Sequence, residues 1–187
     1  MSARFNIEAT KLTGLSVLTR KHICDSRGWF ERMFCTEELQ EVLNKRSVVQ
    51  INRTLTQQRG SVRGMHFQHP PSAEMKFVSC LRGQVFDVAV DLRLGSATFL
   101  QWHAELLSAD NLKTLVIPEG FAHGFQTLTD DCEMFYLHTA AYDPTAQGGL
   151  NPEDPALTIA WPLPITKLSP SDTSRPLIIK GFTGVRL

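Results

Sequence analysis

Hydrophobic and polar residues alternate along residues 83–96, and this alternation is the clearest structural signal in the chain. A period of two is typical of a β-strand, because successive side chains of a strand point to opposite faces of the sheet. One face of this predicted strand would hold Phe86, Val88, Val90 and Leu92, and the other Val85, Asp87, Ala89 and Asp91. The segment therefore predicts a strand with hydrophobic side chains on both faces.

Several further segments are predicted to be short strands separated by turns. Arg82-Gly83 is interpreted as a hairpin turn, which would make residues 74–81 the partner of the strand just described. In that partner, Lys76, Val78 and Cys80 would share a face. Additional strands are predicted at residues 112–117, 124–129 and 132–139, with turns at residues 118–120 and 130–131.

One helix is predicted over residues 36–44, with Thr36 as its N-cap and two acidic residues in its first turn. Pro and Ser are frequent from Asn151 onward, which predicts irregular structure packed over the sheets. No repeat or linker divides the sequence, so residues 1–187 are expected to form one domain. Many short strands with regularly spaced turns predict an all-β sandwich or barrel with a few short peripheral helices.

The composition narrows the classes of function. Hydrophobic residues make up 42% and charged residues 20% of the 187 residues, which is ordinary for a globular protein. Nineteen basic residues balance nineteen acidic ones, and no apolar run reaches the roughly 20 residues of a membrane helix, so neither nucleic acid nor a membrane is an expected partner. The N-terminus lacks the pattern of a signal peptide. The four cysteines show no C-x-x-C spacing, and we expect reduced thiols in a cytoplasmic protein, three or four of them in the core.

The stretch "RGMHFQHPPSAEMK", residues 63–76, raises the question of a metal site. It and "PEGFAHG", residues 118–124, resemble the cupin pattern, in which His123 would be a metal ligand. The first stretch departs from that pattern, because the residue two positions after His66 is Gln68, and His69 would point to the opposite face of a strand. A neutral amide is a poor ligand for zinc or iron. We therefore expect no bound transition metal.

The same stretch suits proton transfer. Histidine is the residue type most often used as a general base, and a hairpin could bring Lys76 beside His66. A lysine inside a barrel needs a negative partner, and the simplest one is a ligand that is or becomes an anion. Tyr136 on a further strand could act as a general acid. These residue types favour proton abstraction next to a carbonyl, although a buried His and Tyr with a surface Lys would be compatible with structural roles alone.

Six segments in order also resemble the dTDP-4-dehydrorhamnose 3,5-epimerase family of sugar-nucleotide epimerases. They are "DSRGWFE" (25–31), "QINRTLTQQRGSVRGMHFQHPP" (50–71), "GQVFDVAVDLRLGSATF" (83–99), "IPEGFAHGF" (117–125), "FYLHTAAYDP" (135–144) and "DPALTIAWP" (154–162). The resemblance continues to "SPSDTSRP" (169–176) and covers about four-fifths of the chain. It implies a cupin-type jelly roll without metal or organic cofactor, usually a homodimer in which the N-terminal strand crosses to the partner.

The resemblance also implies roles for individual residues. His66 matches the family's catalytic base, Asp172 the carboxylate that pairs with it, Lys76 the group that stabilises the enolate, and Tyr136 the general acid. The residues that match the substrate-binding set are Arg27, Phe30, Glu31, Gln50, Asn52, Arg63, His123 and Tyr142. The chain departs from the family pattern at Thr54, Thr56, Gln147, residues 152–155 and Ser171. Gln147 and residues 152–155 would border the sugar and the base, so the substrate is the feature that the resemblance predicts least.

The implied activity is inversion of C3 and C5 of a nucleoside-diphosphate 4-keto-6-deoxy sugar, which would give dTDP-4-dehydro-L-rhamnose. Three alternatives stay open: an enzyme that inverts only one centre, a non-catalytic sugar-nucleotide-binding cupin, and a metal-dependent oxygenase, which Gln68 disfavours.

Overall fold

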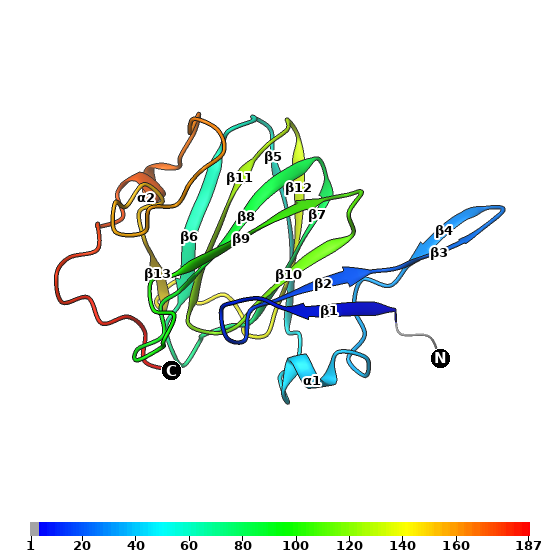
Figure 1. Cartoon of the computed structure of the whole chain (residues 1–187), viewed down its shortest axis with the longest axis horizontal. Coiled ribbons are helices and arrows are strands. Elements are labelled where there is room, and N and C mark those ends of the chain that lie inside the picture. Colours follow the sequence, from blue (N-terminus) through cyan, green and yellow to red (C-terminus); the bar gives the residue numbers. More distant parts are fainter. Residues whose placement is uncertain (1–3) are drawn as a thin grey trace.

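The computed structural model describes residues 4–187, in which two antiparallel sheets face each other and form a jelly-roll barrel (Figure 1). The six-stranded sheet contains, in spatial order, β1 (Phe5–Ala9), β2 (Ser16–Arg20), β10 (Lys113–Ile117), β7 (Lys76–Arg82), β12 (Cys132–His138) and β5 (Gln50–Thr56). The five-stranded sheet contains β13 (Gln147–Gly149), β6 (Val62–Gln68), β11 (Phe121–Thr127), β8 (Gln84–Asp91) and β9 (Trp102–Ser108). The all-β prediction is confirmed.

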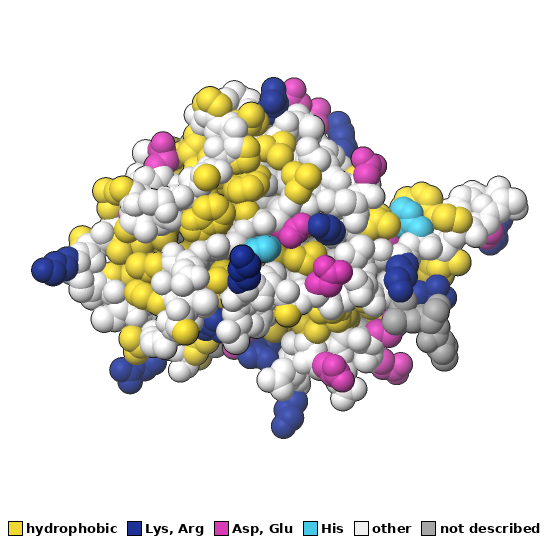
Figure 2. Space-filling model, viewed as in Figure 1, with side chains coloured by type: hydrophobic (Ala, Val, Ile, Leu, Met, Phe, Trp, Pro, Cys, Tyr) yellow, Lys and Arg dark blue, Asp and Glu magenta, His cyan; other side chains and the backbone are white. Residues whose placement is uncertain are grey.

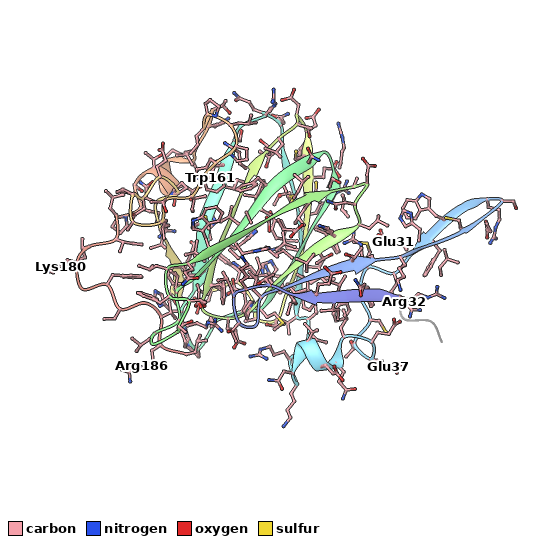
Figure 3. All side chains as sticks on the ribbon, viewed as in Figure 1. Glu31, Arg32, Glu37, Trp161, Lys180 and Arg186 are labelled. Carbon is pink, nitrogen blue, oxygen red and sulfur yellow. The ribbon has the colours of Figure 1, made fainter. Side chains whose placement is uncertain are left out.

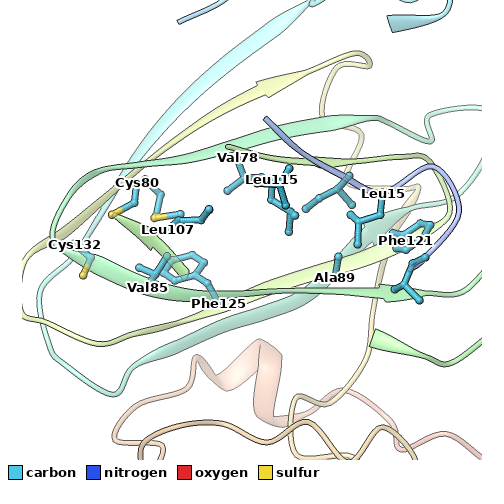
Figure 4. Packing of buried hydrophobic residues seen from close by; sticks show 14 residues of the cluster. Leu15, Val78, Cys80, Val85, Ala89, Leu107, Leu115, Phe121, Phe125 and Cys132 are labelled. Atoms are coloured by element: carbon cyan, nitrogen blue, oxygen red, sulfur yellow. The ribbon is translucent and has the colours of Figure 1, made fainter. Parts of the chain in front are cut away.

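The main core lies between the inner faces of the two sheets (Figure 4). Val78 and Leu115 of the six-stranded sheet meet Val85, Ala89 and Phe125 of the five-stranded sheet there. The alternation predicted for β8 is confirmed, since its inward face includes Val85 and Ala89. Burial of these side chains stabilises the barrel by about 25 cal/mol for each Å² of apolar surface removed from water.

The outward face of β8 is covered by the C-terminal segment. Val88, Val90 and Leu92 pack there with Leu157 and Val185, and the segment contains the short helix α2 (Pro170–Thr173). The predicted irregular tail packed over a sheet is therefore confirmed. On the other side of the barrel, the helix α1 (Gln40–Leu43) closes a third hydrophobic cluster. Within residues 4–187, no helix has the length and apolar character needed to cross a membrane.

Two local predictions were wrong. β7 and β8 do not form a hairpin: the turn at Gly83 carries the chain from one sheet to the other, so β7 pairs with β10 and β12 while β8 pairs with β9 and β11. The helix begins at Gln40 with Leu39 as N-cap, because residues 36–39 form turns and Thr36 makes no cap. Alternation identifies the face of a strand, but it does not identify the neighbouring strand.

The four cysteines are free thiols in three environments. Cys80 and Cys132 are buried in the main core, and Cys35 packs against the cluster next to α1. Cys24 is exposed on β3 (His22–Asp25). Three of the four cysteines therefore belong to a core cluster or pack against one, as predicted, and Cys24 is the one that lies outside.

The strands β3 and β4 (Gly28–Glu31) form a hairpin that projects away from the barrel (Figure 1). Hydrophobic side chains gather along this hairpin (Figure 2), and among them Trp29 is 62% and Phe30 57% exposed. The root of the hairpin is held by Glu31 (Figure 3), whose Oε1 accepts a hydrogen bond from Nε of buried Arg20 at 2.7 Å. The hairpin is thus anchored to β2 at its root, while its tip projects away from the barrel (Figure 1).

Candidate active site

The inner faces of both sheets carry polar side chains at one end of the barrel, where three neighbouring cavities open. One cavity of about 210 Å³ lies between His66 and His123 on one sheet and Lys76 and Tyr136 on the other. A second, of about 150 Å³, shares His66 and Lys76 with it. A third, of about 470 Å³, extends from His66 toward the C-terminal segment. His66 lines all three cavities and stands at their junction.

The side chain of His66 is paired with a carboxylate from α2. Its Nε2 lies 2.6 Å from Asp172 Oδ1. Burial favours a higher pKa for Asp172, but its hydrogen bonds with His66 and Ser169 outweigh burial and hold the pKa below its ordinary value. An ionised carboxylate can only accept, so Nε2 carries the proton and Nδ1 is the basic nitrogen. The pair is suited to general base catalysis.

Backbone packing beside His66 depends on a glycine. Gly64 has a φ of +133°, and a Cβ at this position would lie only 2.5 Å from Gly124 Cα on the neighbouring strand. A larger residue would separate β6 from β11 at the level where His66 and His123 face each other in register. Gly64 therefore sets the spacing of the two histidines.

His123 forms a second histidine–aspartate pair, deeper in the barrel. Its Nε2 lies 2.8 Å from Asp87 Oδ1, and Asp87 is completely buried. Burial raises the pKa of Asp87 above its ordinary value, although His123 opposes the shift. The ring of His123 meets the ring of Tyr136 edge-on, with their centroids 6.2 Å apart. The pair thus supports the inner wall next to the phenol.

The ammonium group of Lys76 has two partners within the chain. Its Nζ lies 2.9 Å from Glu74 Oε1 and donates to the backbone carbonyl of His66 at 3.3 Å. One correction follows: the negative partner of Lys76 is the carboxylate of Glu74 rather than a ligand alone. An ammonium has three N–H groups, so one remains for an oxygen in the cavity. Lys76 comes from the facing sheet and not from a hairpin with β6.

Tyr136 and His138 lie two residues apart on β12 and share its inner face. Burial raises the pKa of Tyr136, so its phenol keeps its proton throughout the physiological range. Burial and the nearby charge of Lys76 lower the pKa of His138 to about 4, so its imidazole is neutral at pH 7. The wall opposite His66 therefore offers a protonated phenol and an uncharged imidazole.

Gln68 has a structural function. Its amide nitrogen donates to Glu74 Oε2 at 2.6 Å and to the carbonyl of Ser72, and its carbonyl accepts from the backbone N–H of Asp143 at 2.7 Å. Both ends of the amide are thus occupied by protein groups. No group of three His, Cys, Asp or Glu side chains among residues 4–187 is arranged to hold a metal ion.

Most of the predicted site residues meet at these cavities. The nine that line them are Gln50, Asn52, Arg63, His66, Lys76, His123, Tyr136, Tyr142 and Asp172. Arg27, Phe30 and Glu31 line none of the three within one copy of the chain, because they belong to the projecting hairpin. Arg27 instead pairs with Asp25, and both side chains are exposed.

Three polar residues of the site were missed by the sequence analysis. Glu74 lies two residues before Lys76, Asp87 lies among hydrophobic residues of the inward face of β8, and His138 lies two residues after Tyr136. The period of two would have placed His138 on the same face as Tyr136. A carboxylate alternating with buried Val85 and Ala89 likewise indicates a buried partner, which proves to be His123.

The barrel and its paired acid and base groups define a cupin-type protein equipped for proton transfer. Residues 9–179 match the family described as dTDP-4-dehydrorhamnose 3,5-epimerase. The chain is 39% identical over 170 residues to the dTDP-4-dehydrorhamnose 3,5-epimerase of Sinorhizobium fredii, covering 90% of this chain and 87% of the relative. This chain belongs to the dTDP-4-dehydrorhamnose 3,5-epimerase family, whose named members are isomerases.

Two further relatives bear on substrate and outcome. The structure of dTDP-6-deoxy-D-glucose-3,5-epimerase from Legionella pneumophila, in complex with dTDP-4-keto-L-rhamnose, superposes with a TM-score of 0.90 at 38% identity and covers 98% of both chains. The dTDP-4-dehydrorhamnose 3-epimerase of Streptomyces niveus is 35% identical over 171 residues, covering 91% of this chain and 82% of the relative. The relatives therefore include enzymes named for one centre and enzymes named for two.

Proposed function

We propose that this protein is an epimerase that converts dTDP-4-dehydro-6-deoxy-D-glucose to dTDP-4-dehydro-L-rhamnose by inverting C3 and C5. One observation carries the proposal: the His66–Asp172 pair and Tyr136 stand on opposite walls of one cavity, and Lys76 lies on the same sheet as Tyr136, facing His66. Inversion requires a base on one face of the sugar and an acid on the other, and this is the arrangement that the two sheets provide.

The proposed chemistry uses the C4 ketone to acidify the neighbouring carbons. His66 Nδ1 removes the proton from C3 or C5, and Asp172 stabilises the resulting imidazolium. The electron pair of the broken C–H bond moves to the C4 oxygen, where the remaining N–H of Lys76 stabilises the enolate. Tyr136 then donates its proton to the opposite face of the carbon, which inverts the centre. The imidazolium of His66 then releases its proton to solvent and the phenolate of Tyr136 takes one up, which restores both groups.

The nucleotide is proposed to occupy the cavity of about 470 Å³ between β6 and the C-terminal segment. Arg63 and Lys167 line this cavity and provide positive charge for a diphosphate. The Legionella pneumophila relative was crystallised with dTDP-4-keto-L-rhamnose, which supports a deoxythymidine nucleotide. Gln50, Asn52 and Tyr142, at the other end of the cavities, would then contact the sugar.

A homodimer is part of the proposal. The β3–β4 hairpin exposes Trp29 and Phe30 and holds Arg27 away from its own cavities. If the hairpin lies against a second copy, these apolar side chains are buried and Arg27 can reach the partner's nucleotide site. We also infer that residues 1–187 act as one epimerase domain in the cytoplasm, where a reducing environment would keep the four thiols free.

Incubation with dTDP-4-dehydro-6-deoxy-D-glucose in D₂O, followed by NMR, tests the function. Deuterium at both C3 and C5 together with the L-rhamno product is expected. Deuterium and inversion at only one carbon would replace the proposal by a monoepimerase, and no exchange at either carbon would leave a non-catalytic binding protein. Size-exclusion chromatography with light scattering, applied to wild type and to Trp29→Ser, tests the dimer separately.

A further inference from the structure

A chain of hydrogen bonds leads from the backbone N–H of Tyr142 through two side-chain amides to His138. The N–H of Tyr142 donates to Gln50 Oε1 at 2.9 Å. Because that oxygen is the acceptor, the other end of the Gln50 amide is its NH₂ group, which lies 3.2 Å from Asn52 Oδ1. The NH₂ group of Asn52 in turn lies 3.3 Å from His138 Nε2. Each amide orientation follows from the one before it.

The chain determines the tautomer of His138. An NH₂ group can only donate, so Nε2 must be the unprotonated nitrogen of the imidazole. The proton of a neutral ring then resides on Nδ1. Among residues 4–187, no hydrogen bond involves Nδ1 of His138, and the atom does not belong to the fully enclosed polar atoms without a partner. The ring therefore has an N–H at Nδ1 that no protein group within residues 4–187 accepts.

The position of the ring places this donor next to the reacting groups. His138 and Lys76 are paired in register on adjacent antiparallel strands, so their side chains emerge side by side on the inner face. Both residues line the two smaller cavities together with His66 and Asn52. The ring also stacks on Tyr136, with an interplanar angle of 23° and centroids 6.0 Å apart. Three donors of different acidity thus line one wall.

We propose that His138 is a further catalytic residue, whose Nδ1–H donates a hydrogen bond to the C4 oxygen of the sugar as that oxygen becomes an enolate. The inference rests on the proposed epimerase function and deepens it. Lys76 and His138 would share the developing charge, one as a cation and the other as a neutral dipole. Gln50 and Asn52 acquire a second function beyond sugar contact, because they hold the imidazole in the tautomer that can donate.

A neutral imidazole suits this position better than an imidazolium. The ammonium of Lys76 is adjacent and already paired with Glu74 Oε1, so a second positive charge would be repelled. A neutral N–H can still polarise a carbonyl oxygen, and it does not compete with Tyr136 as a proton source. The low pKa of His138, about 4, is consistent with the same arrangement.

Two substitutions distinguish the nitrogens of the ring. In His138→Asn, the side-chain amide nitrogen can take the place of Nδ1, whereas in His138→Gln the amide reaches only the place of Nε2. Solvent-deuterium exchange at C3 and C5 is expected to fall about 10²-fold in His138→Gln, which is typical for loss of one oxyanion donor, and to be largely retained in His138→Asn. Binding of dTDP, which lacks the sugar, should be unchanged in both variants.

Equal exchange in wild type, His138→Asn and His138→Gln would overturn the inference, as would equal losses in the two variants. If wild type itself shows no exchange, the proposed function fails, and this outcome is distinct from a failure of the role of His138. The ¹⁵N spectrum of ¹⁵N-histidine-labelled wild type gives an independent measurement: a protonated Nδ1 and an unprotonated Nε2 are expected for His138 at neutral pH. The opposite tautomer or an imidazolium would overturn the inference.

Discussion

The barrel contains two histidine–aspartate pairs of nearly the same geometry, and they differ in what can reach them. The Nε2–Oδ1 distance is 2.6 Å for His66–Asp172 and 2.8 Å for His123–Asp87. The side chain of His66 is 36% exposed, whereas that of His123 is 7% exposed and its carboxylate is inaccessible. A base that must exchange its proton with solvent needs access, so exposure assigns the base to His66 and a supporting position to His123.

Removing the imidazoles one at a time should have the largest effect. His66→Ala is expected to lower deuterium exchange at C3 and C5 by about 10²–10⁴-fold, the usual contribution of general base catalysis. His123→Ala should cost much less exchange, because His66 and Asp172 remain intact, while dTDP binding survives in both variants. Exchange rates measured by NMR provide the test, and near-full activity of His66→Ala would contradict the assignment.

Lys76→Met keeps most of the aliphatic stem and removes the charge. Proton exchange at both carbons should slow by about 10²–10³-fold, because the enolate that follows abstraction by His66 would lose its cationic partner. The single-turnover exchange rate is the measurement, with His69→Ala as a control, since His69 is exposed and lies outside the cavities. A wild-type rate in Lys76→Met would exclude enolate stabilisation by this residue.

Tyr136→Phe should change the outcome of the reaction more than its first step. His66 would still exchange protons with solvent, but no phenol would deliver a proton to the other face, so deuterium should enter with retention. Tyr142 lines the adjacent cavity and could replace the acid, so the Tyr136→Phe/Tyr142→Phe variant is the matched control. If both variants epimerise at the wild-type rate, a tyrosine acid is excluded and His123 or water becomes the next candidate.

The two carboxylates should affect stability with opposite dependence on pH. The pKa of Asp172 is lowered from 3.8, so its contribution is present above that value and is lost as the pH falls. The pKa of Asp87 is raised, so its contribution is greatest at low pH and declines as the pH rises above 3.8. Urea unfolding of wild type, Asp172→Asn and Asp87→Asn should be measured at pH values below and above 3.8. The difference in the free energy of unfolding between each variant and wild type should change with pH in opposite directions for the two variants. Parallel slopes would show that the two pairs are electrostatically alike.

The smallest effect is expected from metal removal. Extended dialysis against EDTA should leave activity unchanged, because both ends of the Gln68 amide are occupied by protein groups and the imidazoles of both pairs are bound to carboxylates. Metal content by elemental analysis accompanies the activity assay. Loss of activity that returns with stoichiometric zinc, iron or manganese would revive the oxygenase alternative.

The sequence showed which side chains share a face of a strand, but it did not show which strands are neighbours in a sheet. The inward face of β8 could be identified, because Val85 and Ala89 alternate with residues of the other face. That Gly83 connects two sheets depends on packing between distant segments, which no local pattern encodes. His66, Lys76 and Tyr136 are predicted from their chemistry as well as from the resemblance, whereas Asp172 is predicted from the resemblance alone. The structure brings all four to the adjoining cavities.

The positions that escaped prediction share a physical reason. Glu74 and His138 have short-range neighbours that reveal their face but not the partner across the barrel, so the ion pair with Lys76 and the amide chain to His138 became visible only in three dimensions. Arg27 and Phe30 were predicted to contact the substrate, but the hairpin holds them away from the cavities of their own chain. Their contact with substrate stays a prediction that depends on a second copy of the chain.

The base and its carboxylate are 106 residues apart in the sequence, because Asp172 is carried by α2 in the C-terminal segment. A ribosome therefore completes the last strand of the barrel, β13, before it adds the carboxylate that activates His66. A chain cut between β13 and α2 would retain all thirteen strands found in residues 4–187 and most of the sugar cavity, yet its imidazole would lack an orienting partner. Full activity would therefore require that the polypeptide is synthesised, and remains intact, beyond residue 172.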